Sequence, residues 1–142
     1  AQHPALTANS GNLALLGDVT FLHDSNGLIL GPQEPRPDLT IVVVNDDGGA
    51  IFTMLEQGAE EYADRFETLF GTPHGIDVGP IVAALGGEHR VVAHADLGAA
   101  IRDSVGRPGI RVLELRTDRA RNLHLHREVA SVVQRSIAGA AG

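Results

Sequence analysis

Short apolar runs alternate with segments of helical periodicity along this chain. Four of the runs predict strands, at residues 13–16, 40–44, 90–95 and 109–116. The first two look like buried strands of a parallel sheet, because the apolar residues follow one another without polar alternation. Both stop at an acidic residue near glycine, Asp18 in the first case and Asp46 in the second.

Four helices are expected between and after these strands. Asp24 or Ser25 can cap a short helix before a proline-rich loop. Asp77 can cap a second helix that has Pro80 in its first turn and stops at two glycines. A third follows Asp96, and residues 119–138 carry apolar positions at helical spacing that predict the last.

This alternation of strands and helices predicts the fold class. We expect one α/β domain over residues 1–142, a three-layer sandwich with a mainly parallel sheet and helices on both faces. The segment 56–67 carries five acidic residues and one arginine, so we expect a solvated helix or loop, and its length raises the hypothesis of a lid.

Composition narrows the classes of protein that the chain can represent. Its 142 residues are 43% hydrophobic and 4% aromatic without tryptophan, which favours one aliphatic core. The net charge of -7 and the lack of a basic stripe argue against a nucleic-acid partner. The absence of cysteine excludes disulfides and thiolate metal sites, and no apolar run is long enough for a membrane span. We expect a soluble, cytoplasmic protein, and a chain without an initiating methionine suggests a fragment of a longer one.

Asp18 and Asp46 are the main candidates for chemistry. Ligands of parallel sheets collect at the carboxyl ends of the strands, where both residues are expected. Two carboxylates, the second of them followed by the sequence DGG with its backbone carbonyls, suit a hard divalent cation. The GDVT turn offers backbone amides and the Thr20 hydroxyl to a phosphate. Asp, Asn and Gly are also the commonest residues at helix caps and turns, so this pattern alone leaves both interpretations open.

Three longer stretches resemble one enzyme family. They are GDVTFLHDSNGLILGP, LTIVVVNDDGGAIFTMLEQG and FGTPHGIDVG. They are similar to the C-terminal thiamin-diphosphate-binding domain of 2-succinyl-5-enolpyruvyl-6-hydroxy-3-cyclohexene-1-carboxylate synthases, which act in menaquinone biosynthesis. The resemblance covers the chain from about Leu13 to the final helix. It implies a thiamin-diphosphate-binding fold whose first elements lie upstream of Ala1.

The resemblance implies a role for each matching residue. Asp18, Asp46 and the backbone carbonyl of Gly48 would bind Mg²⁺ or Mn²⁺, and the metal would hold the diphosphate of thiamin diphosphate. Asp46 stands where asparagine is usual in such enzymes, and it remains an equally hard ligand. The other expected cofactor-binding residues are Gly17, Val19, Thr20, Gly49, Ile51 and Phe52.

The resemblance also implies the reaction and the partners of the full-length protein. It would be a transferase that decarboxylates 2-oxoglutarate and adds the succinyl carbanion equivalent to isochorismate. The catalytic glutamate would lie on a separate N-terminal domain, usually that of a partner subunit in a homodimer or tetramer. We therefore expect no catalytic residue in this chain, and no turnover by it alone.

Two other functions remain open at this level. The chain could belong to another thiamin-diphosphate enzyme, of the acetolactate synthase or 2-oxoacid decarboxylase type, or it could be a non-catalytic α/β binding module. Among the histidines, His89, His94, His124 and His126 are interpreted as ordinary surface residues. His74 is the exception, since it lies in the FGTPHG stretch and is a candidate for the mouth of the substrate pocket.

Overall fold

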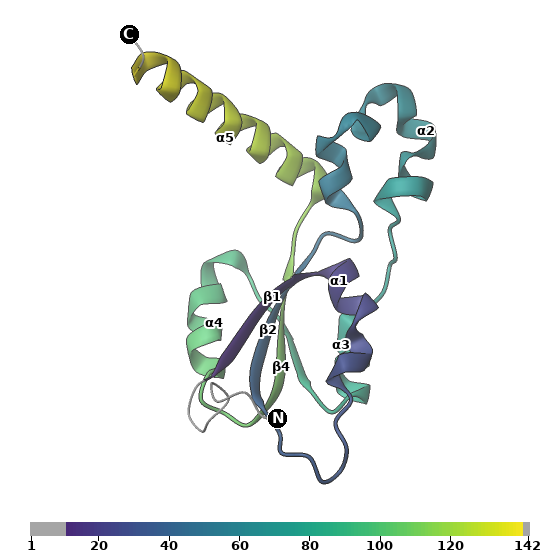
Figure 1. The fold of residues 1–142 in the computed structure, drawn as a ribbon, viewed down its shortest axis with the longest axis vertical. Helices are drawn as coiled ribbons and strands as arrows, with labels where there is room; N and C mark the ends of the chain where they lie inside the picture. Colours follow the sequence, from purple (N-terminus) through teal and green to yellow (C-terminus); the bar gives the residue numbers. More distant parts are fainter. Residues whose placement is uncertain (1–10, 141–142) are drawn as a thin grey trace, which may run out of the picture. The chain divides into compact units, whose positions relative to one another are not determined.

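The computed structural model describes residues 11–140, which divide into two compact units (Figure 1). The first unit joins the chain up to Asp47 with His74–Arg116, and the second joins Gly48–Pro73 with the chain from Thr117 onward.

The first unit is built on a parallel sheet of four strands. The strands are β1 (Asn12–Gly17), β2 (Asp38–Asn45), β3 (Glu88–Val91) and β4 (Gly109–Arg116), in the spatial order β1-β2-β4-β3. Every neighbouring pair is parallel, so the carboxyl ends of all four strands point to the same end of the sheet. This confirms the α/β fold class with a mainly parallel sheet.

Helices cover both faces of this sheet (Figure 1). On one face, α1 (Asp18–His23) and α3 (Val78–Ala84) bury Phe21, Val78 and Val82 against Ile41, Val43, Ile110 and Val112. On the other, α4 (Leu97–Ser104) packs Ala100 against Val42 and Leu113. Alternate residues of β2 and β4 therefore enter different cores, as the pleat of a strand requires.

Some boundaries differ from those expected. The first helix begins at Asp18, directly after β1, and Ser25–Leu28 forms only a 3-10 turn. Strand β3 ends at Val91 and not at Ala95, because the chain turns into a 3-10 segment at His94–Asp96. Strand β1 lies at the sheet edge and leaves Leu15 70% exposed, so it is not buried on both faces.

The second unit contains the acidic segment and the last helix. From Ala50 to Tyr62 the chain makes three short 3-10 turns, and α2 (Ala63–Phe66) leads into a π-helical turn at Glu67–Gly71. The glutamates of this segment are exposed, which confirms the solvated character expected for it. Helix α5 spans Arg119–Ala140, and Arg119 pairs with Glu67 at 3.0 Å. Within residues 11–140, no helix combines the length and the hydrophobicity that crossing a bilayer requires.

Two helix N-termini offer a matched stability test. The Asp77 carboxylate accepts a hydrogen bond from the Gly79 amide, whereas Asp96 at the start of α4 makes no such bond through its side chain. Asp77→Ala is therefore expected to lower the free energy of unfolding by about 1 kcal/mol, and Asp96→Ala by clearly less. Urea denaturation measures both values, with Asp77→Asn as the variant that keeps the cap. Equal losses for the two alanine variants would contradict the assignment of the cap.

Candidate functional site

Asp18 and Asp46 both follow carboxyl ends of neighbouring strands. The register pairs Gly17 of β1 with Val44 of β2, so Asp18 comes one residue after a paired position and Asp46 two residues after its partner. The strand-end positions expected from the sequence are therefore confirmed for both residues. Their convergence on one cation stays a prediction.

Asp18 is a buried carboxylate at the first position of α1. Its side chain is 4% exposed, and Oδ1 accepts a hydrogen bond of 2.8 Å from the Val19 amide. Its Oδ2 lies 3.0 Å from Nε2 of His74, whose side chain is 13% exposed. A carboxylate removed from water needs such partners, or a cation, to offset its lost hydration. His74, a candidate from the sequence for the mouth of the substrate pocket, thus contacts an expected metal ligand.

The middle residue of the NDDGG stretch, Asp47, has a separate structural role. Its Oδ1 accepts hydrogen bonds from the amides of His74 and Gly75, at 3.1 and 2.8 Å. Its own backbone is left-handed, with φ at 61°, a conformation that aspartate adopts more readily than most residues. Asp47 therefore ties the end of β2 to the segment that precedes α3.

Glu114 is a fully buried carboxylate near the end of β4, and it is not among the candidate residues expected from the sequence. Its Oε1 accepts a hydrogen bond of 2.8 Å from Asn45 Nδ2 and another of 2.8 Å from Arg116 Nε. Its Oε2 lies 2.7 Å from Nε2 of His89. The signal that could have found it is a glutamate inside the apolar run of a central strand, where a charge requires partners.

The environment of Glu114 favours its charged form. Burial by itself would raise the pKa of this carboxyl, but the hydrogen bonds it accepts and the charge of Arg116 outweigh that effect. The pKa of Glu114 consequently lies below its ordinary value of 4.5. The same contact with Glu114 raises the pKa of Arg116 above its ordinary range.

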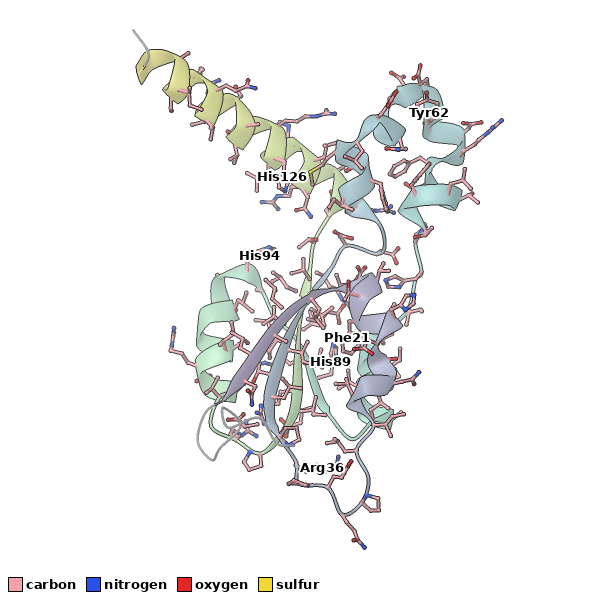
Figure 2. All side chains as sticks on the ribbon, viewed as in Figure 1. Phe21, Arg36, Tyr62, His89, His94 and His126 are labelled. Atoms are coloured by element: carbon pink, nitrogen blue, oxygen red, sulfur yellow. The ribbon has the colours of Figure 1, made fainter. Side chains whose placement is uncertain are left out.

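His89 corrects one expectation from the sequence. It is not a surface residue, because its side chain is 15% exposed and contacts Glu114. Figure 2 shows Phe21 and His89 on the side of the sheet that α1 and α3 cover. His94, His124 and His126 are exposed, as expected.

The remaining expected cofactor residues fall into two groups. In the first unit, Gly17, Val19 and Thr20 are exposed around the start of α1, and the Val19 amide bonds to Asp18. In the second unit, Ile51 is 66% exposed, and the ring centroid of Phe52 lies 5.8 Å from that of Phe70. Their contact with a cofactor stays a prediction.

Gly48 and Gly49 pack directly against the backbone of residues 70–72. A Cβ on Gly48 would lie 2.1 Å from the Gly71 carbonyl oxygen, and one on Gly49 would lie 2.2 Å from that of Phe70. Gly48 also has φ at +127°, which side-chain-bearing residues rarely adopt. Only glycine fits at these two positions, so the DGG sequence has a steric basis within the second unit.

The donor set at these strand ends fits a hard divalent cation. Carboxylate and carbonyl oxygens are the ligands that Mg²⁺ prefers, and cysteine, the ligand of softer metals, is absent from the sequence. Across the part of the chain that the structure describes, no group of three or more His, Cys, Asp or Glu side chains is arranged to hold a metal ion. The expected site is of another kind, because it combines two carboxylates with a backbone carbonyl.

The chain is similar in sequence to several synthases of one family. The chain is 54% identical over 136 residues to 2-succinyl-5-enolpyruvyl-6-hydroxy-3-cyclohexene-1-carboxylate synthase of Saccharopolyspora erythraea. The aligned segment covers 95% of this chain and 24% of that protein. It is 53% identical to the synthase of Rhodococcus opacus over 82% of this chain and 22% of that protein. For the synthase of Mycobacterium avium the identity is 47%, over 85% of this chain and 22% of that protein. The chain thus spans about a quarter of the length of these relatives. No family model matches the chain.

One solved structure is similar in fold. Benzoylformate decarboxylase from Polynucleobacter necessarius aligns with a TM-score of 0.59 and 20% identity, over 78% of this chain and 20% of that one. Together with the parallel sheet, this likeness confirms the fold expected from the sequence.

The depressed pKa of Glu114 sets a pH dependence of stability. In the unfolded chain this carboxyl titrates near 4.5, whereas the folded state holds it charged to lower pH. Its contribution is therefore fully present above that value and lost as pH falls through the folded pKa. Denaturation of wild type and Glu114→Gln at neutral pH, and again well below pH 4.5, measures it. The stability difference between the two proteins is expected to shrink in acid, and a constant difference would contradict this assignment.

Proposed function

The chain belongs to the family of 2-succinyl-5-enolpyruvyl-6-hydroxy-3-cyclohexene-1-carboxylate synthases, as their C-terminal domain, and on this premise we propose that it supplies their metal and diphosphate site. The full-length enzyme would decarboxylate 2-oxoglutarate and add the resulting succinyl unit to isochorismate in menaquinone biosynthesis. The observation that carries this proposal is the register that pairs Gly17 with Val44. It puts Asp18 and Asp46 after neighbouring strand ends in a chain about half identical to these synthases.

In this proposal, Asp18, Asp46 and the carbonyl of Gly48 bind Mg²⁺, with Mn²⁺ as a substitute. These ligands would be hard oxygen donors, the kind that Mg²⁺ prefers, and the metal would hold the diphosphate of the cofactor. The residues assigned to thiamin diphosphate itself are Gly17, Val19, Thr20, Gly49, Ile51 and Phe52. When bound, thiamin diphosphate supplies the carbanion chemistry, and this chain holds and orients it.

The rest of the enzyme completes the site. The glutamate on which proton transfer at the cofactor depends is assigned to an N-terminal domain of a partner subunit. The full-length enzyme is accordingly proposed to be a homodimer or tetramer. Its reaction class is that of a transferase, and the cytoplasm is the proposed location. The chain alone would then bind cofactor weakly and catalyse nothing, because it provides one side of the site.

Substrate choice tests the proposed reaction. The full-length enzyme is expected to consume 2-oxoglutarate together with isochorismate, and to release carbon dioxide from 2-oxoglutarate far faster than from pyruvate. Release of carbon dioxide and the loss of isochorismate absorbance measure both reactions. Preference for pyruvate would instead assign the chain to an enzyme of the acetolactate synthase or 2-oxoacid decarboxylase type.

A pair of variants tests the metal ligands in the full-length enzyme. Asp18→Ala is expected to weaken Mg²⁺-dependent binding of thiamin diphosphate by at least about a hundredfold, since loss of a ligand exceeds the effect of outer residues. Asp46→Asn keeps an oxygen ligand and is expected to retain binding. Calorimetry of thiamin diphosphate at fixed Mg²⁺ measures both, with Asp24→Ala, an exposed residue outside the site, as the control. Unchanged binding by Asp18→Ala would remove this metal assignment.

A further inference from the structure

The ring of His74 is held in one tautomer. Its Nδ1 accepts a hydrogen bond of 2.9 Å from the Ile76 amide, so this nitrogen carries no proton. The proton of the neutral ring is therefore on Nε2, which donates to Asp18 Oδ2 at 3.0 Å. Asp47 Oδ1 also lies 3.5 Å from Nδ1, but that distance is longer, and the Ile76 amide already occupies the nitrogen lone pair.

A neutral donor suits a metal ligand for a simple electrostatic reason. It fixes the direction of the Asp18 carboxylate without cancelling its negative charge, which remains available to a cation. A carboxylate oxygen can also accept more than one interaction, so a bond to His74 and coordination of a metal are compatible. Residues that orient ligands in this way commonly set metal affinity.

Asp47 fixes the backbone from which the His74 ring extends. Its Oδ1 holds the amides of His74 and Gly75, and its own amide donates to Asn45 Oδ1 at 3.0 Å. Asn45 in turn donates through Nδ2 to the buried Glu114. A continuous chain of hydrogen bonds thus runs from the core of the sheet, through Asn45, Asp47 and His74, to Asp18.

We propose that Asp47 and His74 are positioning residues that orient the Asp18 carboxylate and thereby raise the affinity of the site for Mg²⁺. The inference rests on the proposed function, in which Asp18 is a metal ligand. It assigns different tasks to adjacent carboxylates, because Asp46 is the proposed ligand and Asp47 only aligns the residue that orients another ligand. Neither Asp47 nor His74 is required to touch substrate or cofactor.

The test uses the full-length synthase and measures the Mg²⁺ concentration that half-saturates thiamin diphosphate binding, followed by circular dichroism of the bound cofactor. His74→Leu, which removes the donor, is expected to raise this concentration about tenfold. His74→Gln places an amide donor near the position of Nε2 and is expected to restore most of the affinity. The thermal midpoint of the metal-free protein is recorded for every variant, and His94→Leu, at an exposed position, is the matched control.

A double-mutant cycle tests whether Asp47 acts through His74. Asp47→Gly removes the carboxylate acceptor and tolerates the left-handed backbone at this position. Like His74→Leu, it is expected to raise the half-saturating Mg²⁺ concentration. Asp47→Asn keeps an acceptor oxygen and is expected to resemble wild type. The double variant His74→Leu with Asp47→Gly should be no weaker than His74→Leu alone, because both changes interrupt one pathway.

The outcomes separate this inference from the proposed function. If wild type shows no Mg²⁺-dependent binding of thiamin diphosphate, the proposed function fails and this inference fails with it. If wild type binds but His74→Leu has the same Mg²⁺ dependence, only the positioning role is overturned. A lower thermal midpoint with an unchanged Mg²⁺ dependence, or fully additive effects in the cycle, would likewise overturn it.

Discussion

Parallel pairing of β1 with β2 is the constraint on which the candidate site depends. The carboxyl ends of two parallel strands lie at the same end of their sheet. The register, which pairs Asn12 with Leu39 and Gly17 with Val44, keeps those ends level. A shift of one residue would reverse the faces of every side chain in β1 and separate the two turns. The position of Asp18 therefore depends on the apolar packing that fixes this register, in which Phe21 shares one core with Ile41 and Val43.

Glu114 brings a charge into the same sheet at a considerable cost in hydration. Three side chains offset that cost, from β2, from β3 and from β4 itself. Asn45 also extends these hydrogen bonds beyond Glu114. Its Nδ2 donates to Glu114, and its Oδ1 accepts a hydrogen bond from the backbone amide of Asp47. A polar network that starts at the buried Glu114 thus connects the centre of the first unit to the turn that carries the proposed ligand Asp46.

The NDDGG sequence combines several physical requirements within five residues. Asn45 connects to the core, Asp47 adopts a left-handed backbone and holds the next loop, and the two glycines leave room for the backbone of residues 70–72. Any one of these requirements would explain a single residue of the motif. Their combination accounts for Asn45, Asp47 and the two glycines, and in the proposed function the carboxylate of Asp46, within the same stretch, binds the metal.

The sequence by itself determined the alternation of strands and helices, the parallel α/β class and the strand-end positions of Asp18 and Asp46, because hydrophobic periodicity and glycine or acidic stops are local signals. Resemblance to known synthases, also visible in the sequence, indicated the family. Only the tertiary structure decided that β1 lies at the sheet edge, that His89 contacts Glu114 and that His74 contacts Asp18. Those contacts join residues 25 and 56 positions apart. No local pattern encodes such pairings, since they arise only when the packed sheet brings its loops and strand ends together.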